Sequence, residues 1–365
     1  MVTKEVVCVV GARPNFMKMA PVLEGLRPNP EIQPYLVHTG QHYDAEMSRV
    51  FFDELGLPEP DHNLEIGSDT HGRQTGQIMS AFDELLEGRS TRAVVVVGDV
   101  NSTMACGLVA VKRGIPLAHV EAGLRSGDRS MPEEINRLVT DAVSDLLFAT
   151  SEDAVTNLAA EGIPASRVRL VGNPMIDTLR RNEPVARGKR TWERFGLSER
   201  GYALVTLHRP SNVDNPNNLR AIIHALDELS RRIPILFPAH PRTLERIRQG
   251  DIRPGVALTL TRPVGYLDFL SLMTAARFVL TDSGGVQEET TALGVPCLTL
   301  RENTERPVTV SEGTNKILGA DPAAIVSAAE KLLQGGPPSP RFPALWDGHA
   351  GQRIAAELGE FLGCP

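Results

Sequence analysis

The sequence has few cysteines, few aromatic residues and no excess of positive charge. Its four cysteines are far apart in a chain of 365 residues and form no Cys-x-x-Cys pair, so neither a zinc cluster nor a disulfide framework is predicted. The formal net charge is -7 at pH 7, and basic blocks interleaved with aromatics are absent. This balance argues against a nucleic-acid partner or an anionic membrane surface, and any anionic ligand must be held by local cations.

Several other signatures are missing as well. No apolar run approaches the length that spans a bilayer, and the N-terminus has no signal-peptide pattern, so we expect a cytoplasmic protein without a membrane partner. The first strand-to-helix turn lacks Gly-x-Gly-x-x-Gly, which weakens an ordinary dinucleotide-binding fold. The nine histidines show no His-Glu-x-x-His spacing, so no metal site is predicted.

What the chain does contain is a repeated alternation of strand-like and helical segments. Residues 6–10 and 93–97 are β-branched runs, typical of parallel strands covered on both faces. The length and a hydrophobic content of 41% favour two domains. We predict an α/β protein with two doubly wound, Rossmann-like domains at 1–172 and 173–350, a cleft between them, and a closing helix within 351–365 that packs back on the first domain.

The element boundaries can be predicted in outline. In the first half, residues 58–76 are rich in Pro, Asp, Gly and His and indicate a long connection, with a helix from Gln77 to Glu87. In the second half, strands are expected at 203–207, 235–238, 257–260, 278–281, 295–300 and 315–318, and helices near 216–232, 241–249, 265–276, 286–293 and 321–334.

The stretch from Thr281 to Glu289 is the strongest local indication of a ligand. A buried strand runs through Ser283, Gly284 and Gly285 into a helix, which brings free backbone N–H groups and the positive end of the helix dipole together. This arrangement favours a phosphate, and a carboxylate one turn further on, at Glu289, suits a ribose diol. For this stretch alone, an ordinary turn with a capping residue remains an alternative.

Ionic residues follow several other predicted strands or begin the next helix. In open α/β sheets ligands bind outside the carboxyl ends of the strands, so a nucleotide-linked sugar is predicted, with the nucleotide on the second domain. For Glu133 the alternative is an acid that stabilises a helix start, and for Arg13 and Lys18 it is a pair of ordinary surface cations. The candidates are Arg13, Lys18, Asp99, Glu121 and Glu133 in the first domain and His208, Arg209 and His240 in the second.

A series of motifs in order along the chain resembles the non-hydrolysing UDP-N-acetylglucosamine 2-epimerases. The resemblance implies the glycosyltransferase-B architecture, usually in a homodimer, and the interconversion of UDP-GlcNAc and UDP-ManNAc without a cofactor. The motifs are Gly11-Ala12-Arg13-Pro14, Met17-Lys18-Met19-Ala20-Pro21, Thr39-Gly40-Gln41-His42, Gly98-Asp99, His119 to Arg125, Pro132 to Arg137, Asp282 to Glu289 and Thr304-Glu305-Arg306-Pro307.

The same resemblance implies a role for each matching residue. Asp99, Glu121 and Glu133 become the acid/base carboxylates, with His208 as a catalytic contact to the leaving group. Arg13 and Lys18 become diphosphate contacts. The UDP contacts are Ser283, Gly284, Gly285 and Glu289, with Arg209, His240 and Arg306 as further substrate-binding residues.

Chemistry explains why such residues are needed. The C2 proton of the sugar is not next to a carbonyl, so loss of UDP to give a 2-acetamidoglucal is the remaining route to epimerisation. Donors that stabilise the departing diphosphate are worth about 3 to 4 kcal/mol each when well placed. Inversion at C2 needs proton-transfer groups on both faces, which accounts for more than one carboxylate.

Three alternatives remain at this point: a 2-epimerase of a related UDP-amido sugar such as a diacetamido uronic acid, a glycosyltransferase of the same fold, and a non-catalytic UDP-sugar sensor. The chain also departs from the family. Asn15 stands where Glu is frequent, and Pro210-Ser211 where Arg-Glu is frequent. A candidate second UDP-GlcNAc site, used by some members, would involve Gln41, His42, Arg73 and Gln74, and we expect Asp44 to weaken it.

Overall fold

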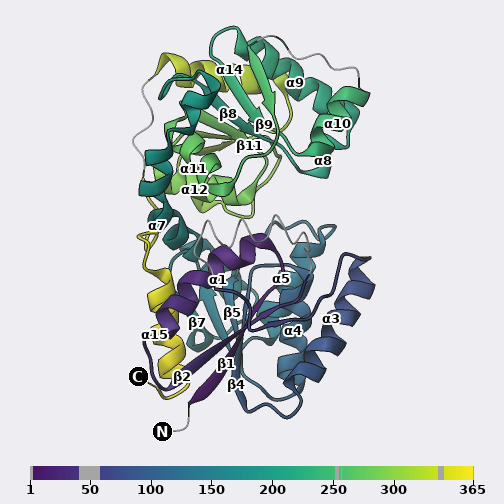
Figure 1. The fold of residues 1–365 in the computed structure, drawn as a ribbon, viewed down its shortest axis with the longest axis vertical. Coiled ribbons are helices and arrows are strands. Elements are labelled where there is room, and N and C mark those ends of the chain that lie inside the picture. The colour runs from purple at the N-terminus through teal and green to yellow at the C-terminus, as the bar shows by residue number, and fades with distance from the viewer. Residues whose placement is uncertain (1–2, 41–57, 251–254, 256, 336–340, 365) are drawn as a thin grey trace. The chain divides into compact units, whose positions relative to one another are not determined.

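The computed structural model describes residues 3–40, 58–250, 255, 257–335 and 341–364 (Figure 1). These residues form two compact units. Unit 1 comprises residues 1–181 and 344–365, and unit 2 comprises residues 182–343. No helix within the described ranges is long and apolar enough to cross a membrane.

Unit 1 contains a seven-stranded sheet in which all neighbouring strands are parallel. The order of its strands is that of a Rossmann-like fold. Successive strands are added toward one edge of the sheet up to β3 and toward the other edge from β4 onward, so the order reverses between β1 and β4. The strands in spatial order are β3 (His62–Asn63), β2 (Ile32–His38), β1 (Lys4–Val10), β4 (Thr91–Val97), β5 (Leu117–Ala122), β6 (Leu146–Ala149) and β7 (Val168–Leu170). The helices are α1 (Arg13–Leu26), α3 (His71–Leu86), α4 (Asn101–Lys112), α5 (Pro132–Val143), α6 (Glu152–Ala160) and α15 (Ala350–Phe361).

The β-branched runs of unit 1 form its core. Alternate residues of β1 and β4, such as Val9 and Val96, pack with Ile78 and Phe82 of α3 and with α4. Helix α15 packs so closely against α1 that glycine is required at position 351. A Cβ at Gly351 would stand 2.3 Å from the carbonyl oxygen of Pro21. The chain end is thereby fixed against the helix that follows β1.

Unit 2 repeats the topology with a six-stranded parallel sheet that reverses between β8 and β11. The strands in spatial order are β10 (Leu258–Thr261), β9 (Ile235–Pro238), β8 (Ala203–Thr206), β11 (Phe278–Thr281), β12 (Cys297–Thr299) and β13 (Asn315–Ile317). The helices are α8 (Pro210–Val213), α9 (Pro216–Ser230), α10 (Pro241–Gln249), α11 (Tyr266–Ala275), α12 (Gly284–Leu293), α13 (Val308–Ser311) and α14 (Pro322–Gln334).

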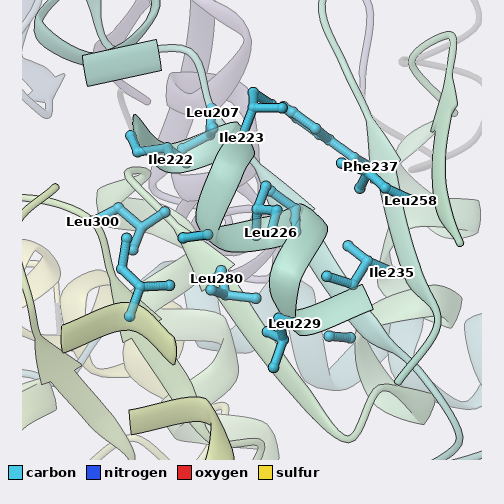
Figure 2. Packing of buried hydrophobic residues seen from close by; sticks show 14 of the residues in the cluster. Leu207, Ile222, Ile223, Leu226, Leu229, Ile235, Phe237, Leu258, Leu280 and Leu300 are labelled. Carbon is cyan, nitrogen blue, oxygen red and sulfur yellow. The ribbon is translucent and has the colours of Figure 1, made fainter. Parts of the chain in front are cut away.

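The core of unit 2 lies between its sheet and the helices α9 and α14. Figure 2 shows Leu226 and Leu229 of α9 beside Ile235 and Leu280 of the strands, all with no more than 1% of their surface exposed. Burying a side chain of this size stabilises the fold by about 1.5 to 3 kcal/mol. Asn215 caps α9 by accepting from the backbone N–H groups of Asn217 and Asn218, which fixes where the helix begins.

Two boundaries differ from the sequence-based expectation. Helix α3 begins at His71 rather than at Gln77, although Gly72 and Gly76 disfavour a helix. Tertiary contacts explain the difference, because Gln74 is buried, donates to the carbonyl oxygen of Gly67 and accepts from Asn101.

The second difference lies beyond Gly172, where the domain boundary was expected. A single helix, α7 (Pro174–Lys189), occupies this region, and the compact units divide within it, between Arg181 and Asn182. The chain crosses again between residues 343 and 344, ahead of the predicted 350.

Candidate active site

Asn15 connects the two loops at the point where the sheet order of unit 1 reverses. Its Oδ1 accepts from the backbone N–H groups of Gly11 and Ala12, at 3.2 and 2.9 Å. Its Nδ2 donates to the carbonyl oxygen of Val97, the last residue of β4, at 3.0 Å. A glutamate at position 15 could not donate a hydrogen bond to the carbonyl oxygen of Val97. The asparagine, which stands where the motif resemblance suggests glutamate, therefore changes how α1 is fixed to β4.

Lys18 and Glu121 form a buried ion pair beside these loops. Their side chains are 7% and 3% exposed. Gly98, which follows β4, is needed at this point because its φ is +70°. A Cβ there would also lie 3.0 Å from Nδ2 of Asn15 and 3.4 Å from Oε2 of Glu121. The turn before Asp99 and the ion pair therefore occupy one tightly packed site.

The backbone of Glu121 is itself unusual, with φ at +73°. A left-handed conformation costs a residue other than glycine on the order of 1 to 3 kcal/mol and persists where surrounding contacts enforce it. Such conformations cluster at functional sites. The end of β5 therefore holds a carboxylate that is buried, paired with a cation and supported by a strained backbone.

Asp99 is held from helix α5. Nη1 of Arg137 lies 2.5 Å from Oδ2 of Asp99, and Nδ2 of Asn136 donates to the carbonyl oxygen of Asp99 at 2.9 Å. Asp99 keeps 30% of its side chain exposed, whereas Arg137 is 3% exposed. Helix α5 therefore fixes both the side chain and the backbone of Asp99.

The two acids at the start of α5 have different environments. Glu134 is buried and accepts from the backbone N–H groups of Ser126 and Gly127 and from Arg137. Burial acts to raise the pKa of Glu134, but these hydrogen bonds outweigh it and hold the pKa below its usual value. Glu133 is half-buried, so of the pair it is Glu133 that presents a carboxylate to solvent.

In unit 2, His208 and Asp282 form a dyad where the sheet order reverses. Nδ1 of His208 lies 3.0 Å from Oδ1 of Asp282. The carboxylate also accepts from the backbone N–H groups of His208 and Arg209. Burial acts to raise the pKa of Asp282, but these donors hold it below its usual value. Because the aspartate is fully buried and His208 is 51% exposed, the dyad fixes one ring nitrogen and leaves the rest of the ring facing outward.

The phosphate turn predicted around Ser283 begins helix α12 as expected. Ser283 is the N-cap residue but makes no side-chain capping bond, which leaves the first N–H groups of the helix for another partner. Gly284 leaves room for Arg306, because a Cβ there would stand 2.6 Å from Nη1 of that side chain and displace it. Arg306 is held by Glu288, 2.8 Å from its Nε.

Three arginines gather around two glutamates beside this helix start. Glu305 binds Arg301 through both oxygens, at 2.7 and 2.9 Å, and lies 3.6 Å from Arg209 and from Arg306. Although burial acts to raise the pKa of Glu305, these arginines lower it to about 2. With Glu288 ionised, the cluster carries one surplus positive charge. The Nε of Arg209 is buried and has no hydrogen-bond partner, as expected of a donor that awaits an anion.

Glu289 lies one turn along the same helix and has a different state. Its Oε1 accepts from the hydroxyl group of Tyr266 at 2.9 Å. Burial raises the pKa of Glu289 to about 7, despite the hydrogen bond from Tyr266. The carboxyl group therefore titrates near neutrality in the absence of a ligand.

Comparison with known proteins identifies the family. A sequence model described as UDP-N-acetylglucosamine 2-epimerase matches residues 24–359. The UDP-N-acetylglucosamine 2-epimerase of Methanocaldococcus jannaschii is 42% identical over 334 residues, 89% of this chain and 91% of that protein. The chain belongs to the UDP-N-acetylglucosamine 2-epimerase family. It is therefore an epimerase, an isomerase, as the motifs predicted.

Solved structures agree with the fold of this epimerase. A crystal structure of the M. jannaschii enzyme in complex with UDP-GlcNAc and UDP has a TM-score of 0.88 at 40% identity, covering 98% of this chain and 99% of that one. The calicheamicin glycosyltransferase, with a TM-score of 0.56 at 14% identity, covers 100% and 99% and is similar in fold alone. The predicted glycosyltransferase-B-like class, with two parallel α/β sheets, is confirmed.

One relative of this epimerase has another substrate in its name. The UDP-2,3-diacetamido-2,3-dideoxy-D-glucuronate 2-epimerase of Pseudomonas aeruginosa is 40% identical over 333 residues, covering 90% of this chain and 92% of that protein.

The other predicted site residues of this epimerase have the following places in the fold. His240 is the exposed N-cap of α10 and accepts from the backbone N–H of Arg242. Arg73 is exposed on α3, where its neighbour Gln74 is buried by the contacts given above. Gln41, His42 and Asp44 lie outside the described residues, and Arg13 is the first residue of α1.

Sequence reasoning missed several residues that the epimerase fold brings to these clusters. Asp282 belonged to a quoted motif but was given no role of its own, yet it pairs with His208. Arg137 and Arg301 were not singled out, although Arg137 binds Asp99 close to the end of β4 and Arg301 binds Glu305. The position of Asp282 in the sequence could have identified it. It directly follows a strand at which the sheet order reverses, and ligand sites form at such places.

Proposed function

We propose that this epimerase interconverts UDP-GlcNAc and UDP-ManNAc by eliminating UDP to a 2-acetamidoglucal and adding it back. The observation that carries this proposal is the set of carboxylates at the strand ends of unit 1. Glu121 is buried against Lys18 on a strained backbone, and Asp99 is held by Arg137. A UDP-sugar sensor would not need acid/base groups kept in such positions.

Unit 2 binds UDP in this proposal. The surplus positive charge around Glu305, the free Nε of Arg209 and the uncapped start of α12 all favour a diphosphate. Glu289 accepts hydrogen bonds from the ribose diol in its ionised form. Gly284 and Gly285 provide backbone N–H groups, Ser283 contacts UDP through its hydroxyl group because its N–H donates to Thr281, and His240 is a further contact.

His208 assists the departure of UDP. The carboxylate of Asp282 accepts from Nδ1 of the ring, and in the imidazolium form Nε2 carries the second proton, which it donates to the diphosphate as the C1–O bond breaks. The stabilisation grows with the negative charge on the leaving oxygen, so it acts on the transition state more than on bound substrate.

Unit 1 supplies the proton transfers. One carboxylate among Asp99, Glu121 and Glu133 takes the C2 proton, and the C2–H electron pair forms the C1–C2 double bond as UDP leaves with the C1–O pair. A second group returns a proton to the opposite face of C2 while UDP re-adds at C1. Arg13 and Lys18 contact the diphosphate.

A related UDP-amido sugar is the second candidate substrate. The resemblance to the P. aeruginosa diacetamido-glucuronate enzyme, at nearly the same identity as the UDP-GlcNAc enzymes, favours it specifically. An incubation of pure protein with UDP-GlcNAc alone, followed by proton NMR, tests the first proposal. New UDP-ManNAc anomeric signals are expected. Turnover only of a diacetamido uronic acid substrate would assign the second, and a product formed only with an added acceptor would indicate a glycosyltransferase.

We further propose a cytoplasmic homodimer without nucleic-acid or membrane partners. The family resemblance and the acidic net charge support this. We also propose that Asp44 weakens a second UDP-GlcNAc site at Gln41, His42, Arg73 and Gln74. UDP-ManNAc alone should then be epimerised without a lag, and a reaction that stays silent until traces of UDP-GlcNAc are added would contradict this.

A further inference from the structure

His119, in the middle of β5, has no exposed surface, and both of its ring nitrogens face acceptors. Nε2 lies 2.8 Å from the carbonyl oxygen of Gly98. Nδ1 lies 2.6 Å from Oδ1 of Asp141, on α5. Because a carbonyl oxygen only accepts, Nε2 must carry a proton. The state of Nδ1 then depends on whether Asp141 is ionised.

Asp141 has the partners of an ionised carboxylate. Its Oδ2 accepts from the backbone N–H of Gly123 at 3.0 Å and lies 2.7 Å from Nη2 of Arg125. These two donors compensate the negative charge of Asp141 independently of the state of His119. An ionised Asp141 has no proton to give, so the contact of 2.6 Å requires a proton on Nδ1 as well.

We propose that His119 is a doubly protonated imidazolium that positions the loops carrying Asp99 and Glu121. Gly98 directly precedes Asp99, and Gly123 follows Glu121 by two residues. Through Asp141, a single buried pair therefore binds both loops. His119 is a positioning residue, since its ring nitrogens are both occupied by the protein.

Backbone strain makes such a support necessary. Glu121 has a left-handed φ of +73°, which is strained for a residue other than glycine, whereas Gly98 adopts its φ of +70° without strain. The hydrogen bond from Gly123 to Asp141 lies two residues from Glu121 and opposes relaxation of its loop. A small displacement of an acid or base can slow proton transfer by about a hundred-fold.

The charges around the ring favour its protonated state. Asp141 is the carboxylate in contact with it, and beyond Asp141 lies Arg125, which is bound by Glu161 through two hydrogen bonds of 2.7 and 2.6 Å. With His119 protonated, the ring and the side chains of Asp141, Arg125 and Glu161 together carry no net charge. Near Gly98, the Lys18–Glu121 ion pair is also neutral in sum. Loss of the ring proton would leave the buried Asp141 with less compensation.

The direct test is the protonation state of His119 in the intact protein. The ¹⁵N spectrum of histidine-labelled enzyme is recorded between pH 6 and 9, and the signal of His119 is assigned by its loss in His119→Gln. Two protonated ring nitrogens are expected at pH 7. A ring with one unprotonated nitrogen at pH 7 would overturn the proposal. The readout needs no activity, so it stands apart from the proposed epimerisation, on which only the positioning role rests.

The positioning role is tested with Asp141→Asn. Asparagine keeps an acceptor for Gly123 and donates to a neutral ring, so the shape is kept while the charge is removed. We expect kcat to fall at least about ten-fold, while the Kd of UDP, bound by unit 2, stays within about two-fold. The matched control is Asp145→Asn at the other end of β5, where Asp145 accepts from the backbone N–H of Leu117; its kcat should be unchanged.

Two results would contradict the positioning role. One is a folded Asp141→Asn enzyme with kcat close to that of the wild type. The other is a parallel loss of kcat, UDP affinity and melting temperature, which would assign Asp141 to the stability of the fold alone. If the wild-type protein epimerises no UDP-sugar, the proposed function fails, and the ¹⁵N measurement still decides the state of the ring.

Discussion

At the scale of single residues, the site is defined by which charges are neutralised within the protein and which are left for a ligand. The carboxylates of Glu134, Asp282 and Glu305 each have several donors, and their pKa values lie below the usual range. Glu289 is the opposite case, since it is buried with the hydroxyl of Tyr266 and next to Glu288 on the same helix. A carboxylate in that position becomes fully satisfied only when a ligand supplies donors.

Glu289 should therefore make the stability of the free enzyme depend on pH. Its pKa rises from 4.5 in the unfolded chain to about 7 when folded, so only the unfolded state releases this proton between those values. The resulting loss in the free energy of unfolding is absent below pH 4.5, grows as the pH rises and is complete above pH 7, where it is on the order of 3 kcal/mol. Replacing Glu289 by Gln should raise the melting temperature at pH 8 and change it little at pH 4.5. Equal shifts at both pH values would show that ionisation of Glu289 is not the cause.

His208 should act on turnover more than on binding. In His208→Ala we expect kcat to fall by about a hundred-fold or more, because the leaving diphosphate loses its donor, while the Kd of UDP measured by calorimetry changes far less. His224, exposed on α9, provides the matched control, and His224→Ala should behave as the wild type. Near-normal turnover in His208→Ala would make His208 only a structural residue at a strand end.

At the scale of elements, the reversal of sheet order in each unit determines where chemistry can occur. In unit 1 it brings the ends of β1 and β4 together through Asn15, and in unit 2 it brings the ends of β8 and β11 together through Asp282. Neighbouring parallel strands that lead away in opposite directions leave room for a ligand and for the helix starts that face it. The start of α12 is the clearest example.

A methyl group at Gly284 should weaken UDP binding. It would stand 2.6 Å from Nη1 of Arg306, so the guanidinium group must move from the position that Glu288 gives it. We expect Gly284→Ala to raise the Kd of UDP at least about ten-fold, an effect of about 1.4 kcal/mol. Gly72→Ala is the control, because nothing lies within 4 Å of that position on α3; UDP affinity should be unaffected and the helix slightly more stable. Unaltered affinity in Gly284→Ala would exclude Arg306 from the UDP site.

At the scale of the whole molecule, the sequence predicts the elements well because hydrophobic period and turn residues are local properties. Strands 235–238 and 278–281 and helix 241–249 lie where predicted. The start of α3 could not be predicted, because the burial of Gln74 against Asn101 depends on segments distant in sequence. The same reason explains the site. Strand ends identified Asp99, Glu121 and His208, but partners such as Arg137 and Asp141 are recognisable only once α5 is packed on the sheet.

The central claim is that epimerisation proceeds through removal and return of the C2 proton by separate groups of this protein. The most direct measurement is the NMR spectrum of UDP-GlcNAc incubated with the enzyme in D₂O. The account predicts deuterium at C2 of the UDP-ManNAc that forms and, more slowly, in the UDP-GlcNAc pool, because the returned proton comes from a group that has exchanged with solvent. Complete retention of the original hydrogen at C2 in the product would contradict the elimination route.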